Sequence, residues 1–374
     1  MPSYRVFAAD IGKDRDVLLA IWRRNLKDSY RLEEKIRWHF ADNPCGEGRC
    51  WILEADGEPV GATSLGMRSM KLGSETISAG VACDLAVDRN HRFLHPALLL
   101  QKALLASLKP PVRMVYGFPG PEGASVLRRA GYRPSFLVDR YAKVLRLSPY
   151  LDRNARWRPF VRVAGRALDS AYGAFSGLHM HSRRRYAAET LGDFDERFDE
   201  LWNRGSRRQA VLTVRDSRFL RWRYRDCPLR EYTTIALLSP DRSRLFGNLI
   251  YYIENHTAIC ADIFAADQGG EAVDPLSCLL SHWMRTARGK NLTGLSLACS
   301  ADDALLEAIR RLHFGRRTAA GRTAVPKRAA PKSALSKQAG KEQSRPLLAY
   351  CETAFPTPGA AAGWYFTPGD QPYN

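Results

Sequence analysis

The chain has 374 residues, of which 45% are hydrophobic and 26% are charged, with 57 Lys and Arg against 39 Asp and Glu for a net charge of +18. This composition is typical of a soluble globular protein of about two domains, and it excludes disorder along the whole chain. The longest apolar stretch, residues 94–108, contains polar residues and is shorter than the ~18–20 residues of a membrane span. The first residues lack the pattern of a secretory signal.

The predicted elements, taken in chain order, form a series that occurs twice. Each series begins with an amphipathic helix and a second helix that stops before a proline, because the residue before proline avoids the helical region. Hairpin strands follow, then a strand, a long helix, a strand, a short helix and a closing strand. The first series has helices at 16–26, 31–41, 96–108 and 122–130 and its last strands at 112–118 and 136–146. The second series has helices at 194–204, 215–225, 273–288 and 302–312 and its last strands at 293–298 and 346–353.

Paired residues indicate that the two series are copies of one unit. Trp38 and Trp222 are separated by 184 residues, and so are the two prolines that end the second helices. Because order, spacing and residue type agree at several points, we interpret the chain as an internal repeat. We therefore predict an α/β fold with two tandem domains, at 1–147 and 186–374, each a mixed, mostly antiparallel sheet flanked by helices.

Two basic segments stand apart from the repeat. Segment 148–185 carries eight Arg against two Asp and is expected to link the copies. Segment 318–345 is rich in Ala, Lys, Ser and Pro, and is expected to be a disordered insertion. We interpret both as solvated segments, and binding of an anionic partner is the alternative. The second segment has no aromatic residue, which disfavours a nucleic-acid module.

The most specific motif lies in the first copy. Leu85-Ala86-Val87 ends a strand, and the run from Arg92 to Ala97 begins five residues after Val87 and opens a long helix. In these residues the chain resembles the GNAT acyltransferase superfamily, in which a Leu-x-Val strand precedes a Gln/Arg-x-x-Gly-x-Gly/Ala loop. The short helix that leads into Gly131-Tyr132 is similar to the terminal element of that family. The resemblance implies two tandem GNAT-like domains that use acetyl-CoA or another acyl-CoA.

The resemblance also implies where the coenzyme binds. In the family, backbone N–H groups at the helix start hold the pyrophosphate, so Arg92, His95 and Ala97 are the expected contacts. Backbone N–H groups near Leu85 and Val87 are expected to hold the thioester carbonyl and its oxyanion. His95 replaces the central glycine of the loop, and the second copy has no comparable loop. We therefore expect the first copy to bind the coenzyme.

Two residues are candidates for proton transfer. Asp84 is expected beside the cleft as a general base, or as an acceptor that orients the amine, and Asp262 holds the equivalent place in the second copy. Tyr116 is the candidate that protonates the leaving thiolate. The alternatives are a structural carboxylate paired with a cation for the aspartates and a core aromatic for the tyrosine. Where the family often has a catalytic tyrosine, the chain has Leu127 and Ile309.

The function that the sequence favours is a cytoplasmic, acyl-CoA-dependent N- or O-acyltransferase acting on a small-molecule or peptide acceptor. The eight cysteines form no C-x-x-C pair, so buried thiols in a reducing compartment and no metal are expected. Two alternatives stay open. One is a non-catalytic, degenerate GNAT scaffold, and the other is a Fem-like transferase that takes an aminoacyl group from tRNA.

Overall fold

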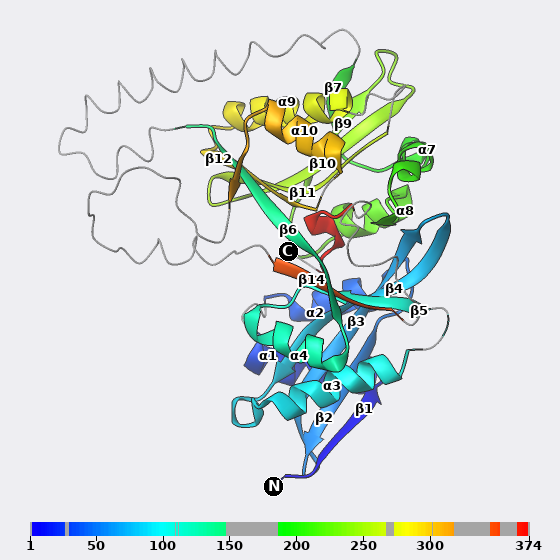
Figure 1. The fold of residues 1–374 in the computed structure, drawn as a ribbon, viewed down its shortest axis with the longest axis vertical. Coiled ribbons are helices and arrows are strands. Elements are labelled where there is room, and N and C mark those ends of the chain that lie inside the picture. The colour runs from blue at the N-terminus through cyan, green and yellow to red at the C-terminus, as the bar shows by residue number, and fades with distance from the viewer. Residues whose placement is uncertain are drawn as a thin grey trace, which may run out of the picture.

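A computed structural model describes residues 2–26, 30–108, 110, 112–146, 186–266, 273–300, 302–317, 345–351 and 365–372. Its strands form one sheet in the order β1-β2-β3-β4-β5-β14-β6-β12-β11-β10-β9-β7, with β8 beside β3 and β13 beside β6. The two ends of this sheet carry their own helices, and β6 lies in the middle, where it passes from one group of strands to the other (Figure 1). We call the elements β1 to β6 the N-terminal half and those from β7 onward the C-terminal half.

The N-terminal half contains the first predicted series. Its strands are β1 (Tyr4–Ala9), β2 (Arg49–Ala55), β3 (Glu58–Leu72), β4 (Glu75–Val87), β5 (Val112–Gly117) and β6 (Arg133–Val144). Its helices are α1 (Arg15–Asn25), α2 (Leu32–Ile36) with the π-helical turn η1 (Arg37–Ala41), the short η2 (Arg89–His91), α3 (Leu94–Ala106) and α4 (Pro121–Ala130). The β2–β3 hairpin turns at Asp56 and Gly57, whose φ angles of 51° and 89° suit this turn.

The C-terminal half repeats the series. Its strands are β7 (Ala187–Leu191), β8 (Val211–Thr213), β9 (Thr233–Leu238), β10 (Leu245–Glu254), β11 (Thr257–Ala265), β12 (Gly294–Cys299), β13 (Gly315–Arg317) and β14 (Arg345–Cys351). Its helices are α7 (Glu196–Gly205), η3 (Ser206–Arg208), α8 (Ser217–Leu220) with the π-helical turn η4 (Arg221–Arg225), α9 (Val273–Gly289), α10 (Asp303–Arg311) and η5 (Pro368–Asp370). The expected mixed α/β class with helices flanking the sheet is confirmed.

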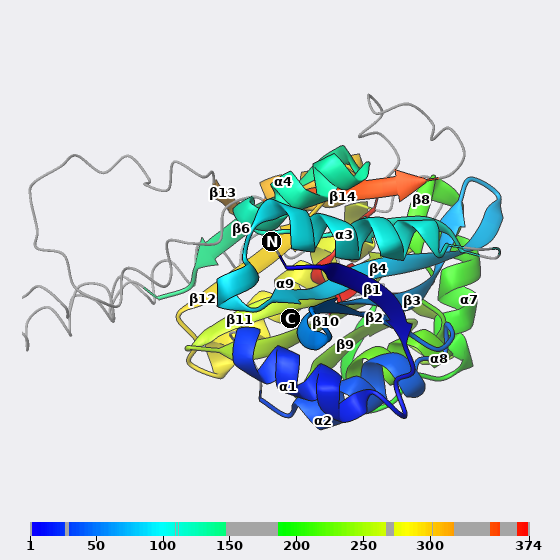
Figure 2. The same ribbon diagram turned by 90° about the horizontal axis from the view of Figure 1, so that it is seen from below.

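Helices cover both faces of the sheet in the N-terminal half. Helices α3 and α4 lie on one face, and α1 and α2 lie on the other (Figure 2). The α3 face buries an apolar cluster that includes Leu100, Leu104 and Val115. The α1 face buries another cluster around Leu18 and Trp22. A site at the end of β4 is therefore held between two packed layers.

The closing strands cross between the halves. Strand β14, from the end of the chain, lies between β5 and β6, where Leu348 is paired with Gly117. Strand β6 in turn pairs with β12 of the C-terminal half. The sequence predicted both strands but not their partners, because alternation of apolar residues reports burial and says nothing about which edge a strand joins. The division into domains at 147 and 186 stays a prediction.

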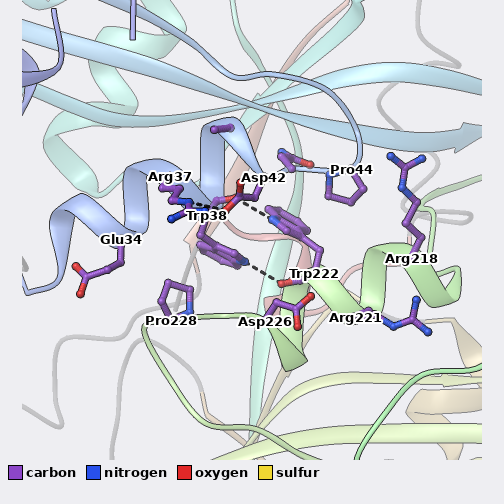
Figure 3. Close-up of a pocket in the computed structure, with 12 residues that line it drawn as sticks. Glu34, Arg37, Trp38, Asp42, Pro44, Arg218, Arg221, Trp222, Asp226 and Pro228 are labelled. Atoms are coloured by element: carbon purple, nitrogen blue, oxygen red, sulfur yellow. Dashed lines mark hydrogen bonds and ion pairs between the residues drawn. The ribbon is translucent and has the colours of Figure 1, made fainter. Parts of the chain in front are cut away.

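The two halves meet at a pair of tryptophans, Trp38 in η1 and Trp222 in η4. Each indole Nε1 donates to the backbone carbonyl of the other tryptophan at 2.8 Å. The rings are stacked with centroids 5.0 Å apart and an interplanar angle of 21°. Figure 3 shows the pair at the centre of a pocket of about 750 Å³, with Pro44 and Pro228 on opposite sides. Residues 184 apart in the sequence thus occupy equivalent elements around a local pseudo-twofold axis.

Substitution of either tryptophan by phenylalanine is expected to lower the free energy of unfolding by about 1–3 kcal/mol, because a buried carbonyl loses its donor. The double substitution Trp38→Phe/Trp222→Phe is expected to cost less than the sum, with a coupling of at least about 0.5 kcal/mol. Urea unfolding of the unsubstituted chain, the two single variants and the double variant measures this coupling. The pair Trp38→Phe/Trp202→Phe is the control, and strict additivity in both pairs would contradict the reciprocal contact.

The two basic segments are not part of this description. Residues 148–185 and 318–345, apart from Arg345 in β14, lie outside the described residues. The expectations of a linker and an insertion therefore stay predictions. Across the described ranges, no helix is both long and apolar enough to span a bilayer.

Candidate active site between splayed strands

Strand β4 contains a bulge at the position of Asp84. Ala62 of β3 pairs with Ala86, but Ser64 pairs with Cys83, so two residues of β4 lie opposite one residue of β3. Asp84 has a φ of 51°, in the left-handed region, as does the first residue of a G1-type bulge. The bulge bends β4 away from its course just before Leu85.

Strands β4 and β5 separate shortly before this bulge. Their parallel pairing ends at Val81 and Tyr116, although β4 continues to Val87 and β5 to Gly117. On the β5 side, the backbone of 82–87 therefore has no neighbouring strand among the described residues. Backbone N–H and C=O groups are obligatory hydrogen-bonding groups. The gap is thus a place where a ligand can pair with β4 in the way a strand would.

Apolar side chains beside the gap are only partly covered. Ala82 and Leu85 of β4 and Ala97 of α3 pack on one apolar cluster but are half-buried, while Val87 is buried. Phe93, directly before α3, is 63% exposed. The sequence placed Leu85, Val87 and Ala97 at the coenzyme site, and the structure brings them together at the mouth of the gap.

The start of α3 has no side-chain cap. Its N-cap residue is Phe93, with an extended backbone, so N–H groups of the first turn are left for a ligand or for water. Pro96 lacks an N–H and removes one of these donors. His95 is exposed, and its ring lies 6.1 Å from that of Tyr4. An anion at this end would also be favoured by the helix dipole.

The side chain of Arg92 is turned towards the protein. Its Nε donates to the carbonyl oxygen of Val87 at 2.9 Å, and an Nη donates to Asn25 at 3.0 Å. Asn25 also donates to Asp88, which pairs with Arg24. Arg92 therefore fixes the loop between β4 and α3. Its charge lies beside the loop, but its hydrogen bonds are directed to the protein.

Asp84 is engaged in a buried ion pair. Its carboxylate lies 2.9 Å from the Lys35 ammonium and also accepts from Ser64 at 3.3 Å. The carboxylate is 3% exposed and the lysine side chain 6%. The backbone carbonyl of Asp84 accepts from Trp22. Lys35 was not among the residues singled out from the sequence, although it is a lone basic residue on the apolar face of its helix.

Tyr116 is fully buried, at the last position of β5 that pairs with β4. Its hydroxyl donates to the carbonyl oxygen of Asp370, in the C-terminal turn, at 3.0 Å. Burial raises the pKa of the phenol well above its usual value, so the hydroxyl stays protonated. Tyr116 and Asp84 both belong to the two strands that separate, and the structure places both near the splay.

A buried histidine lies close to these residues. Burial lowers the pKa of His39 well below its usual value, and the charges of Arg68, Lys35 and Arg223 act in the same direction. His39 is therefore neutral in the folded chain, whereas an exposed histidine binds a proton below a pH of about 6.5. The contribution of His39 to stability is complete above that pH and is lost as the pH falls below it.

The free energy of unfolding is accordingly expected to decrease below about pH 6.5, by up to about 1.4 kcal/mol per pH unit. In His39→Gln this dependence is expected to be weaker. Urea unfolding between pH 5 and 8 measures the slope. His95→Gln, at an exposed position, is the control and is expected to keep the slope of the unsubstituted chain; an unchanged slope in His39→Gln would contradict the assignment.

The C-terminal half has the same strand separation, but there it is filled. Pairing of β11 and β12 ends at Cys260 and Leu297, although β11 continues to Ala265. The segment 365–372 occupies this space. The Tyr365 hydroxyl donates to the carbonyl of Ile263, and Phe366 bridges to Ser300. Every residue from Cys260 to Ala265 is at most 8% exposed, in contrast to the half-buried residues of β4.

A buried polar network fixes that segment. Nε of Arg215 donates to both carboxylate oxygens of Asp262 at 3.1 Å, and an Nη donates to Asp370 at 2.8 Å. Thr367 donates to Asp262 and, with Asp370, caps the turn η5. All four side chains are buried. Asp262, the counterpart of Asp84, thus holds the C-terminal segment.

Solved structures share the fold of this chain, whereas no family model and no curated protein sequence matches it. A probable N-acyltransferase of unknown function from Enterococcus faecalis has a TM-score of 0.60 at 11% identity, over 93% of this chain and 73% of that one. A GCN5-related N-acetyltransferase from Kribbella flavida has a TM-score of 0.55 at 13% identity, over 94% and 71%. The Saccharomyces cerevisiae N-myristoyltransferase with bound myristoyl-CoA has a TM-score of 0.53 at 12% identity, over 95% and 80%.

The fold is GNAT-like. The expected resemblance to this superfamily is confirmed for the fold over almost the whole chain. Similarity at these identities shows the fold and does not assign roles to single residues. This holds for all the site residues predicted from the sequence, namely Asp84, Tyr116, Leu85, Val87, Arg92, His95 and Ala97. Their roles depend on the geometry described above.

Proposed function

We propose that the chain is an acyl-CoA-dependent N- or O-acyltransferase whose N-terminal half binds the coenzyme. The observation that carries the proposal is the contrast between the two strand separations. The gap after Val81 and Tyr116 is bordered by half-buried apolar residues, whereas the gap after Cys260 and Leu297 is filled by Tyr365 and Phe366. A GNAT-like fold with one open and one filled gap supports one coenzyme site.

The coenzyme would approach from the α3 side. Its pyrophosphate would lie at the start of α3, where N–H groups without a side-chain cap and the helix dipole favour an anion. His95 is exposed there and could donate to a phosphate. Arg92 would add positive charge and keep the loop in place through its bond to Val87.

The acyl group would lie between the separated strands. The pantetheine arm would pair with β4 on the side that β5 leaves free, and half-buried Leu85 would contact it. Backbone N–H groups of 85–87 would hold the thioester carbonyl and stabilise the oxyanion when the acceptor attacks. The amine or hydroxyl of the acceptor would form the new bond to the carbonyl carbon and lose its proton to water. The bond between the carbonyl carbon and the coenzyme sulfur would break, so that the thiolate leaves.

We assign the proton transfers from the polar groups at the gap. Tyr116 is protonated at neutral pH and would donate its proton to the leaving thiolate once its bond to Asp370 is exchanged. Asp84 is held by Lys35 at 2.9 Å. That ion pair supports a positioning role, in which Asp84 stabilises the bulge that opens the gap.

The remaining proposals follow from this one. The C-terminal half would complete the acceptor cleft for a small molecule or a peptide. The buried cysteines Cys50, Cys83, Cys260 and Cys299 are free thiols, which supports a reducing compartment such as the cytoplasm. The open gap beside β4 and the uncapped start of α3, both among the described residues, are features suited to a coenzyme. They favour acyl-CoA over aminoacyl-tRNA as the donor of the transferred group.

Thermal melting with acetyl-CoA and with longer acyl-CoA tests the binding step. A coenzyme at about 100 times its Kd is expected to stabilise the folded chain by about 2.7 kcal/mol. Release of the free thiol in the presence of amine acceptors tests the transfer step. If no acyl-CoA raises the melting temperature, the transferase proposal fails and a non-catalytic scaffold becomes the better interpretation.

A further inference from the structure

Two arginines are completely buried where the halves meet, and neither forms an ion pair with a described residue. Arg68 of β3 and Arg223 of η4 are both 0% exposed. The nearby carboxylates of Asp262 and Asp370 are paired with Arg215. Within the described part of the chain, Arg68 and Arg223 form no ion pair. Burial of a cation without a counter-charge is costly, so this arrangement calls for an anion.

The two guanidinium groups converge on one neutral oxygen. An Nη of Arg68 and an Nη of Arg223 each donate to the carbonyl oxygen of Gln371 at 3.4 Å, which is long for such a bond. Each side chain also has a buried N–H without a partner, Nε in Arg68 and Nη1 in Arg223. Two cations around one oxygen, with donors to spare, is the geometry that binds a carboxylate.

The remaining ring and hydrogen-bond partners of the two guanidinium groups are uncharged, and the charge of Asp370 acts on Arg223 without an ion pair between them. Arg68 lies over the Trp222 ring at 5.2 Å, and Arg223 lies over the Trp38 ring at 5.5 Å. Nε of Arg223 donates to the carbonyl of Gly369 at 3.1 Å. The tryptophan pair and the C-terminal turn therefore fix both cations before any ligand arrives, as a preformed site requires.

The position of this pair relates it to the acceptor. Arg68 lies two residues after Gly66 on β3. Gly66 pairs with Val81 of β4, and Val81 pairs with Tyr116 of β5. The charge of Arg68 acts on the Tyr116 hydroxyl. The coenzyme pyrophosphate would lie on the opposite face, at α3. Gln371 and Pro372 are half-buried and follow directly after the turn that Arg215 holds.

We propose that Arg68 and Arg223 bind a carboxylate group of the acyl acceptor, which takes the place of the Gln371 carbonyl. The inference rests on the transferase function proposed above and adds a substrate class, an amine or alcohol that carries a carboxylate. The carboxylate anchors the acceptor on the Tyr116 side of the gap, opposite the coenzyme.

The binding arm of the test uses acetate as the probe and needs no turnover. The melting temperature of the full chain is measured in sodium acetate and in sodium chloride at equal ionic strength. The proposal expects a larger increase in acetate for the unsubstituted chain and for Arg37→Met, whose side chain is 81% exposed. It expects that difference to vanish in Arg68→Met and Arg223→Met. Arg68→Lys keeps the charge and serves as the folding control, with circular dichroism as the readout.

The acceptor arm compares matched pairs, alanine with alaninamide and glycylglycine with its amide, by release of coenzyme thiol. The kcat/KM of the acid is expected to exceed that of the amide at least tenfold. Arg68→Met and Arg223→Met should lose this preference while acyl-CoA still raises their melting temperature. Equal use of acids and amides, or a preference that survives both substitutions, overturns the inference and leaves the transferase function intact.

The two proposals fail in different ways. An acetate effect that depends on Arg68 and Arg223, with no thiol release from any acceptor, supports the anion site and contradicts the transferase function. Absence of an acetate effect in the unsubstituted chain overturns the anion site.

Discussion

Replacement of Ala97 by Glu is expected to abolish the stabilisation that acyl-CoA gives the chain. Ala97 lies in the first turn of α3, half-buried beside the open gap. A carboxylate there stands next to the proposed position of the pyrophosphate, and two like charges at about 4 Å repel each other by about 4 kcal/mol at an effective dielectric constant of 20. The Kd for acyl-CoA is therefore expected to rise at least about 100-fold.

The same substitution should leave the fold intact, because an acidic residue in the first turn complements the helix dipole by about 0.3–1 kcal/mol. The expected result is thus an unchanged or slightly higher melting temperature without coenzyme, and no increase with it. Lys102→Gln, on an exposed position of α3, is the control because it lowers the net charge of the chain by one unit, as Ala97→Glu does. Tight acyl-CoA binding by Ala97→Glu would place the coenzyme elsewhere.

Substitution Arg215→Met is expected to lower the free energy of unfolding by about 3–5 kcal/mol. Arg215 is 2% exposed and holds Asp262 and Asp370, each 1% exposed. Its removal leaves two buried carboxylates without a counter-charge, and breaking a buried pair in this way costs about that much. Urea unfolding measures the loss, and hydrogen exchange of 365–372 is expected to accelerate because the turn η5 loses its anchor.

The repeat provides a matched control for this substitution. Arg31 holds the equivalent place in the first series, 184 residues earlier, but its ion pair with Glu34 is exposed, with 41% and 48% of the side chains accessible. Arg31→Met is expected to cost less than about 1 kcal/mol. Similar losses for the two substitutions would contradict the view that the C-terminal segment is fixed by a buried network.

Much of the fold could be predicted from the sequence because its signals are local. Apolar periodicity located helices such as α1 and α9 to within one or two residues, and prolines marked the ends of η1 and η4. The spacing of 184 residues identified Trp38 and Trp222 as equivalent before their contact was known. The loop motif placed Leu85, Arg92 and Ala97 next to one another, because they are close in the chain.

The features that make a site depended on contacts between distant residues. The sequence predicted β14 and β6 as strands, but only the packed sheet decided that each completes the opposite half. The bulge at Asp84 and the end of the β4–β5 pairing follow from the register of three strands, which no local pattern encodes. That is why the sequence could name the residues of the gap without showing that it is open.

The buried charges were equally hidden. Arg68 and Arg223 carry no sequence signal that sets them apart from the other Lys and Arg of the chain, 57 in all, and Lys35 was not singled out either. The composition of a segment does not report which of its polar side chains the tertiary structure encloses. The C-terminal segment 365–372 carries no motif, yet its contacts with Arg215, Tyr116 and Ile263 fill one gap and border the other. Local sequence determined the helices and strands and their repetition. The tertiary structure decided which gap stays open and which charges are buried near it, because burial depends on residues that are far apart in the chain.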